Sequence, residues 1–156
     1  MDLIDIPINT MAKSTGKFLC GLLLAFPIFA QAELGGNLAS ITQEQKTFGS
    51  TLTTSSQSTY TIYIQSISPD LVIKEYVSNS GNIFGVSWRG STLPDFQMLL
   101  GNYYSNYLSA QQKNPRSIFL QDDNLVLESG GIMGGYIGRA YLPKQVPVGI
   151  APASIQ

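Results

Sequence analysis

The chain has 156 residues, no histidine, a single cysteine and a formal net charge of −1 at pH 7. Once Cys20 is assigned to a leader, Ser-His and Cys-His nucleophilic sites are excluded, as are zinc sites with nitrogen or sulfur ligands. The balanced charge, without a basic stripe, argues against nucleic acid and anionic membrane surfaces as partners, and no motif indicates a cofactor.

The N-terminal 32 residues read as a signal peptide. Lys13 and Lys17 precede a twelve-residue apolar run from Phe18 to Phe29, and an A-x-A cleavage signal follows at residues 30–32. Cleavage would leave Glu33 at the N-terminus, and residues 33–156 would form one domain with an extended C-terminal tail. The prediction is therefore a periplasmic or secreted protein; an uncleaved membrane anchor is the alternative.

The true translation start is expected at Met11. The ten residues before it carry Asp2 and Asp5 but no positive charge, which is the wrong character for the start of a signal peptide.

The remainder of the chain alternates between helical and strand patterns. A short helix is expected within residues 33–49, and the Ser/Thr-rich residues 50–59 read as a loop that leads into the first strand. A long helix from about Pro94 to Gln112 separates three strands from two later ones; the five expected strands cover residues 60–64, 71–77, 83–89, 125–129 and 132–142. The predicted class is α+β, a mostly antiparallel sheet of about five strands with one long helix packed on it.

The clearest pattern surrounds the only tryptophan. Alternation places Phe84, Val86 and Trp88 on one face of a strand. Thr92 fits the cap of the following helix, and Asp95 can reach back as in a capping box. Apolar residues then recur at helical spacing along one side of the helix: Leu99, Leu100, Tyr103, Tyr107 and Ala110. Trp88 is therefore expected to be buried beneath this helix.

Several blocks in fixed order resemble an exported bacterial family known as domain of unknown function 2844. They include Leu-Gly-Gly at residues 34–36, EYV at 75–77, VSWRG at 86–90, PDFQMLLGNYY at 94–104, LVLESGG at 125–131 and GRAYLP at 138–143. The resemblance covers nearly all of residues 33–150. It implies a signal peptide and an unassigned function, and it supplies no catalytic residues.

Three carboxylates admit a catalytic interpretation. Asp122, Asp123 and Glu128 are candidates for an acid/base pair in glycoside hydrolysis, or for a calcium site. Asp122-Asp123-Asn124 is more simply explained as a turn. A hydrolase of cell-wall or extracellular glycans is therefore the alternative function, and an inhibitor of an exported enzyme is a third.

The favoured hypothesis is a non-catalytic binding or interaction module whose partner is an envelope protein or a small ligand. Arg89 and Arg139 each stand near the end of an apolar strand, where a rigid backbone could present the guanidinium to a carboxylate or phosphate. The two would meet only if their strands are neighbours in the sheet. Trp88, Asp95 and Tyr141 complete the candidate binding residues, and ion pairing within the fold is the alternative role for both arginines.

Overall fold

The computed structural model describes residues 33–41 and 50–156. The predicted signal peptide, its cleavage site and the proposed start at Met11 lie outside these residues. Residues 42–49 of the expected N-terminal helix also lie outside the described residues. Residues 38–41, which precede them, have helical conformation. Within the described ranges, no helix is both long and apolar enough to cross a membrane.

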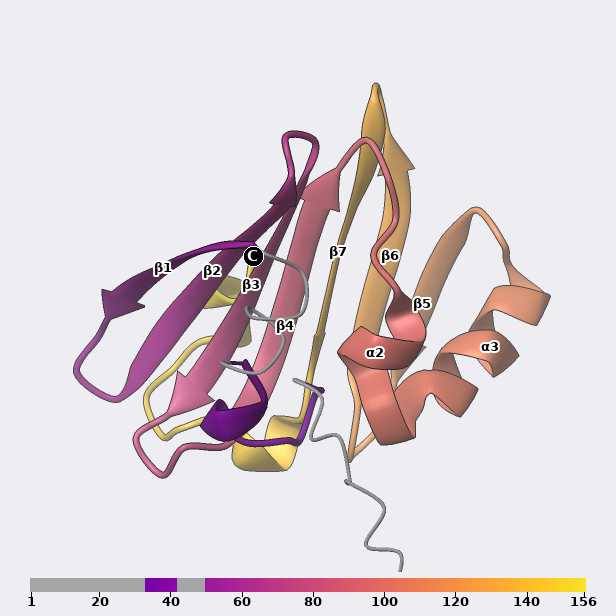
Figure 1. The fold of residues 1–156 in the computed structure, drawn as a ribbon. Coiled ribbons are helices and arrows are strands. Elements are labelled where there is room, and N and C mark those ends of the chain that lie inside the picture. The colour runs from indigo at the N-terminus through magenta and orange to yellow at the C-terminus, as the bar shows by residue number, and fades with distance from the viewer. Residues whose placement is uncertain (1–32, 42–49) are drawn as a thin grey trace, which may run out of the picture.

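The core of the fold is one seven-stranded sheet in which every neighbouring pair is antiparallel. The strand order is β1-β2-β3-β4-β7-β6-β5. Figure 1 shows two antiparallel meanders, β1 to β4 and β5 to β7, which are joined where β4 lies beside β7. The strands are β1 (Thr51–Ser56), β2 (Tyr60–Ser68), β3 (Leu71–Ser78), β4 (Ile83–Gly90), β5 (Ser117–Gln121), β6 (Val126–Ile132) and β7 (Gly135–Tyr141).

The prediction of about five strands with a short N-terminal helix is therefore wrong, whereas the predicted long helix corresponds to the helical residues 96–113. The Ser/Thr-rich segment is strand β1, which pairs along its whole length with β2. Residues 117–121 form β5 at the other edge. The last hairpin also turns later than expected: Ile132 belongs to β6, and Gly134 in the turn has a φ of 81°. The mostly antiparallel arrangement was predicted correctly, and the condition under which the two arginines would meet is fulfilled, because their strands β4 and β7 are neighbours.

The helical segment after β4 is interrupted rather than continuous. It consists of α2 (Phe96–Leu100), the 3-10 turn η1 (Gly101–Tyr103) and α3 (Tyr104–Lys113). Asp95, not Thr92, is the N-cap, because its side chain accepts hydrogen bonds from the backbone N–H groups of Gln97 and Met98. The interruption falls at Gly101, whose φ of 49° favours glycine.

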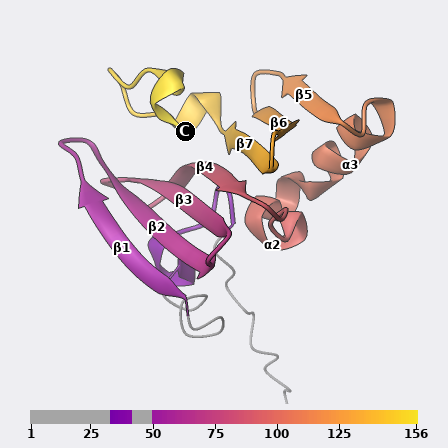
Figure 2. The same cartoon turned by 90° about the horizontal axis from the view of Figure 1, so that it is seen from above.

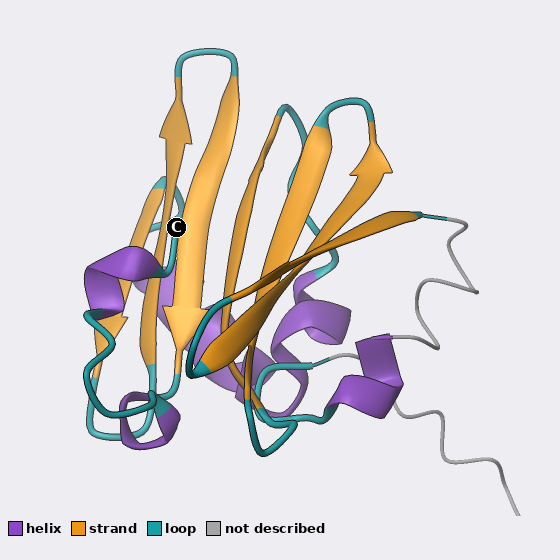
Figure 3. Cartoon of the chain, turned by 90° about the vertical axis from the view of Figure 1, so that its left-hand side faces the viewer, coloured by secondary structure: helices purple, strands orange, loops and turns teal. Residues whose placement is uncertain are grey.

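The helices and the C-terminal tail cover opposite faces of the sheet. Figures 1 and 2 show α2 and α3 on one face and the tail, residues 142–156, on the other. The tail contains the short 3-10 turns η2 (Pro143–Gln145) and η3 (Pro152–Ser154). Figure 3 shows the twist of the strands between these two layers. We call the two sides the helix face and the tail face.

The larger core lies under the helices. Trp88 is only 2% exposed, and its ring meets Phe96 edge-on with the ring centres 5.1 Å apart. Leu99, Leu100 and Tyr107 are buried in the same cluster, with Tyr103 packed against it. The predicted burial of Trp88 beneath the helical segment is confirmed.

A second core lies on the tail face, and it corrects the predicted face of Phe84. A register shift opposite Tyr76 and Val77 places Phe84 with Tyr76, Tyr141 and Ile155 rather than with Trp88. Such a bulge inserts a residue and reverses the alternation beyond it. Ile155 is fully buried in this cluster, so it anchors the tail to the sheet.

Candidate functional site

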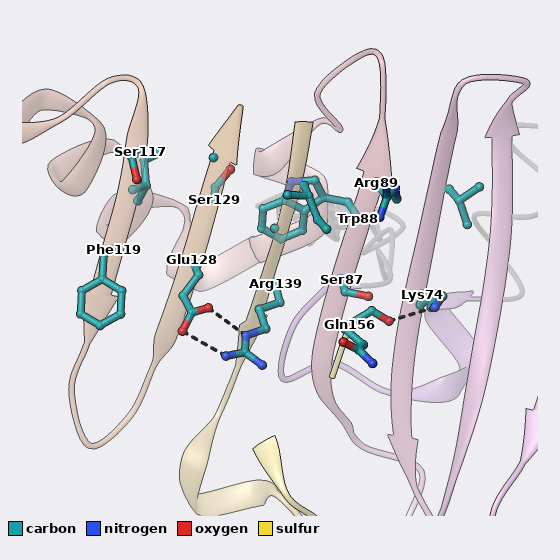
Figure 4. A pocket seen from close by; sticks show the side chains of 15 residues that line it. Lys74, Ser87, Trp88, Arg89, Ser117, Phe119, Glu128, Ser129, Arg139 and Gln156 are labelled. Carbon is teal, nitrogen blue, oxygen red and sulfur yellow. Dashed lines mark hydrogen bonds and ion pairs between the residues drawn. The ribbon is translucent and has the colours of Figure 1, made fainter. Parts of the chain in front are cut away.

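The part of the tail face that the tail leaves uncovered holds a cavity of about 960 Å³. Its walls come from β3, β4, β5, β6 and β7 and from Gln156 in the tail (Figure 4). Ligand sites in proteins typically enclose roughly 300–1,000 Å³, so this hollow has room for a small ligand.

The register of the strands arranges the cavity residues in two rows that cross five strands. In order β3, β4, β7, β6, β5, the first row is Val72, Arg89, Ile137, Gly130 and Ser117. The second row is Lys74, Ser87, Arg139, Glu128 and Phe119. All ten residues line the cavity. On β3, β7 and β6 the next positions, Tyr76, Tyr141 and Val126, belong to the second core, which the tail covers.

Arg139 in the second row has a structural role. Its Nε and Nη2 atoms donate to the two carboxylate oxygens of Glu128 at 3.0 and 3.1 Å. Its Nη1 atom donates to the backbone oxygens of Pro152 and Ile155 at 3.0 and 3.4 Å. The guanidinium therefore joins β7 to β6 and to the tail, and its donors are largely engaged.

The tail is also held at its end. Lys74 Nζ and the Tyr76 hydroxyl donate to the backbone oxygen of Gln156 at 2.9 and 2.8 Å. Figure 4 shows the contact between Lys74 and Gln156 at one side of the cavity. Gln156 is consequently fixed as part of the cavity wall.

Arg89 in the first row differs from Arg139. It is exposed, and it has no ion pair or side-chain hydrogen bond to any residue that the structure describes. Its cross-strand neighbours are the apolar Val72 and Ile137. A guanidinium with free donors beside apolar side chains is well suited to bind a carboxylate or phosphate.

Apolar surface lines the cavity on the β5 side. Phe119 is 66% exposed on the tail face of the edge strand β5. Ile137 is 37% exposed between it and Arg89. At Gly130, between these two residues, an added Cβ would find no atom within 4 Å. The cavity thus combines one unpartnered cation with an apolar wall.

The other predicted binding residues lie elsewhere. The Trp88 side chain packs in the core of the helix face, although the residue contributes to the cavity lining. Asp95 caps α2. Tyr141 is buried in the second core, where the Arg139 Cζ atom lies 5.8 Å from its ring centre. Of the five predicted residues, Arg89 is the one that lines the cavity with a charged group that has no hydrogen bond or ion pair to a described residue.

The carboxylates of the alternative hypothesis have structural contacts. Asp122 Oδ1 accepts the backbone N–H groups of Asn124 and Leu125 at 2.7 and 2.8 Å, and these hydrogen bonds lower its pKa. Glu128 is ion-paired with Arg139. Asp122 and Asp123 border a separate hollow of about 600 Å³ that Glu128 does not line. Within residues 33–41 and 50–156, no three acidic, histidine or cysteine side chains are grouped to hold a metal ion.

The sequence interpretation missed Lys74, Phe119 and Gly130 as cavity residues. The sequence alone does not show that a phenylalanine such as Phe119 is exposed in a cavity, because only the strand register shows which face of the sheet it occupies. The signal for Gly130 was present: a glycine inside a strand often marks a place where another group approaches the backbone.

Comparison with known proteins gives a family but no characterised relative. A family model described as protein of unknown function (DUF2844) matches residues 30–155. No curated protein and no solved structure matches the chain.

Proposed function

We propose that this chain, which belongs to the DUF2844 family of proteins of unknown function, is an exported binding module whose ligand occupies the cavity on the tail face. One observation carries the proposal. Arg89 lies at the edge of the cavity of about 960 Å³, and its side chain has no hydrogen-bond or ion-pair partner among the described residues. An exposed guanidinium with open donors beside an apolar hollow can donate to a carboxylate or phosphate from outside the fold.

Binding is favoured over catalysis because of what surrounds the cavity. The only carboxylate in its two rows, Glu128, forms a bidentate ion pair with Arg139. A general acid or base needs to be free to exchange a proton with substrate. The serines that line the cavity have no histidine to activate them, because the chain contains none.

The rigidity of the cavity supports the same proposal. Arg139, Lys74 and Ile155 fasten the tail to the sheet, so the wall formed by Gln156 is preorganised. A preorganised site loses less conformational entropy when a ligand binds.

Site-specific photocrosslinking in the native host tests the proposal. A benzophenone side chain at Phe119, which is exposed within the cavity, should give discrete adducts. The matched position is Leu108 on α3, which is exposed outside the cavity. Adducts from position 119 that are absent from position 108 support a site on the tail face. No adduct at 119, or the same adducts at both positions, would contradict it.

Export is part of the proposal and has its own test. The intact mass of the protein recovered from the periplasm or medium of the native host should correspond to a chain that begins at Glu33. Recovery of the full-length chain from the cytoplasm would refute export without bearing on the cavity.

A further inference from the structure

We infer that the ligand class is a single-chain amphiphile with an anionic head, a carboxylate or a phosphate, whose head binds Arg89 and whose chain lies across β7 and β6 toward Phe119. The inference rests on the proposed function, because it assigns a ligand to the same cavity. Three features of the two rows support this ligand class: their charge, their apolar surface and their dimensions.

The charge of the rows selects an anion. Arg139 and Glu128 neutralise each other. Lys74 already donates to a backbone oxygen of the tail. Arg89 is left as the cation with unused donors among the described residues of the cavity. Its flat guanidinium can donate two parallel hydrogen bonds to a carboxylate or phosphate.

The surface beyond Arg89 selects an apolar chain. Across β7, β6 and β5 the first row continues with Ile137, Gly130 and Ser117, and Phe119 projects from the second. Gly130 offers no side chain, and the space above it is open. An extended hydrocarbon can lie over this position between Ile137 and Phe119 and bury apolar surface that is now exposed to water.

The dimensions give an expected chain length. Arg89 and Phe119 are separated by three strand-to-strand steps, from β4 through β7 and β6 to β5. Neighbouring strands lie roughly 4.8 Å apart, and the two rows are two residues, or about 6.8 Å, apart along the strands, so the diagonal path is about 16 Å long. Carbon–carbon bonds of about 1.5 Å in a zigzag chain advance about 1.25 Å each, so roughly thirteen bonds, the first within the head group, reach Phe119. We therefore expect the best fit near a twelve-carbon chain.

Glycines 130 and 131 supply a matched pair of variants. Both are in β6, neither has a positive φ, and an added Cβ at either finds no atom within 4 Å. Alternation along the strand places Gly130 on the tail face, in the cavity, and Gly131 on the helix face. Gly130→Leu fills the cavity, whereas Gly131→Leu adds the same side chain on the opposite side of the sheet.

Isothermal titration calorimetry with dodecanoate and dodecyl phosphate, each below its micelle concentration, tests the inference. Residues 33–156 are purified, and all variants are first checked by thermal melting. We expect at least one anionic probe to bind wild type and Gly131→Leu similarly and Gly130→Leu at least tenfold more weakly. Preference between the probes identifies the head group. Hexanoate should bind more weakly than dodecanoate, because its chain ends short of Phe119.

The role of the head is tested separately with Arg89→Gln, a change at an exposed residue. It should weaken binding of the anionic probe roughly 10- to 100-fold, the range for hydrogen bonds to a charged group. Dodecyl maltoside, which has an uncharged head, should show no such difference between Arg89→Gln and wild type.

Three results would overturn the inference: no binding of either anionic probe to wild type, equal binding to Gly130→Leu and Gly131→Leu, or equal binding of the anionic probe to wild type and Arg89→Gln. If the Phe119 crosslinks nevertheless form in the host, the binding module stands and only the ligand class is wrong. If no crosslink forms and no probe binds, both proposals fail.

Discussion

Trp88 packs against Gly138, so a substitution at this glycine tests which side of the sheet each of the two residues faces. Gly138 lies directly opposite Trp88 in the pairing of β4 with β7. A Cβ added there would lie 2.3 Å from Trp88 Cζ2 and 2.6 Å from the backbone oxygen of Glu128. Carbon atoms in favourable contact are about 3.5–4.0 Å apart, so Gly138→Ala requires a movement of more than an ångström.

Neither neighbour can move that far easily. The Trp88 ring is held against Phe96 within the core, and the Glu128 oxygen belongs to a paired strand. Overpacking costs about 1–3 kcal/mol, and two rigid neighbours favour the upper half of that range. For a domain of this size, each kcal/mol lowers Tm by about 3–5 °C, so we expect a decrease of about 6–15 °C.

Thermal melting of Gly138→Ala beside Gly130→Ala measures this cost. Gly130 is on the neighbouring strand with open space around it, so Gly130→Ala should melt within about 2 °C of wild type. Trp88→Leu should reduce the penalty of Gly138→Ala, since the two residues are in contact and their effects are coupled. If Gly138→Ala is as stable as Gly130→Ala, the reasoning about the two faces is refuted.

Three further predictions concern stability. Trp88→Ala should cost roughly 3–5 kcal/mol in urea unfolding; an equally stable variant would place this ring outside the core. Asp95→Ala removes the cap of α2 and should cost about 1 kcal/mol in the same assay, whereas Asp95→Asn, which can still accept the hydrogen bonds, should cost less; equal losses would argue against capping. The pKa of Asp122 is lowered from its ordinary 3.8 by backbone hydrogen bonds, so its ionised form stabilises the fold above that pH, and this contribution disappears as the pH falls through the lowered pKa. The Tm difference between wild type and Asp122→Asn should therefore shrink between pH 5 and pH 2, and a difference that grows on acidification would contradict this turn contact.

The helix face was largely predictable because its signals are local. Apolar spacing after Asp95 identified the side of the helical segment that packs on the sheet, and alternation in β4 identified Trp88 as a core residue. The break at Gly101 was missed because the apolar pattern continues through it.

The tail face was less predictable because it depends on contacts between distant residues. Strand β1 has no alternating apolar pattern; it is an edge strand that pairs with β2. The bulge at Phe84 reverses the alternation beyond it without changing the composition. The role of Arg139 depends on Glu128 and on the tail, which no local pattern connects to it.

The central claim is that the cavity on the tail face holds a ligand, and native mass spectrometry tests it most directly. The protein and its two leucine variants would be purified from the native host without detergent. The account predicts an additional co-purifying mass on wild type and Gly131→Leu that is lost or strongly reduced on Gly130→Leu. An additional mass retained in full on Gly130→Leu, or no additional mass on wild type, would contradict the claim.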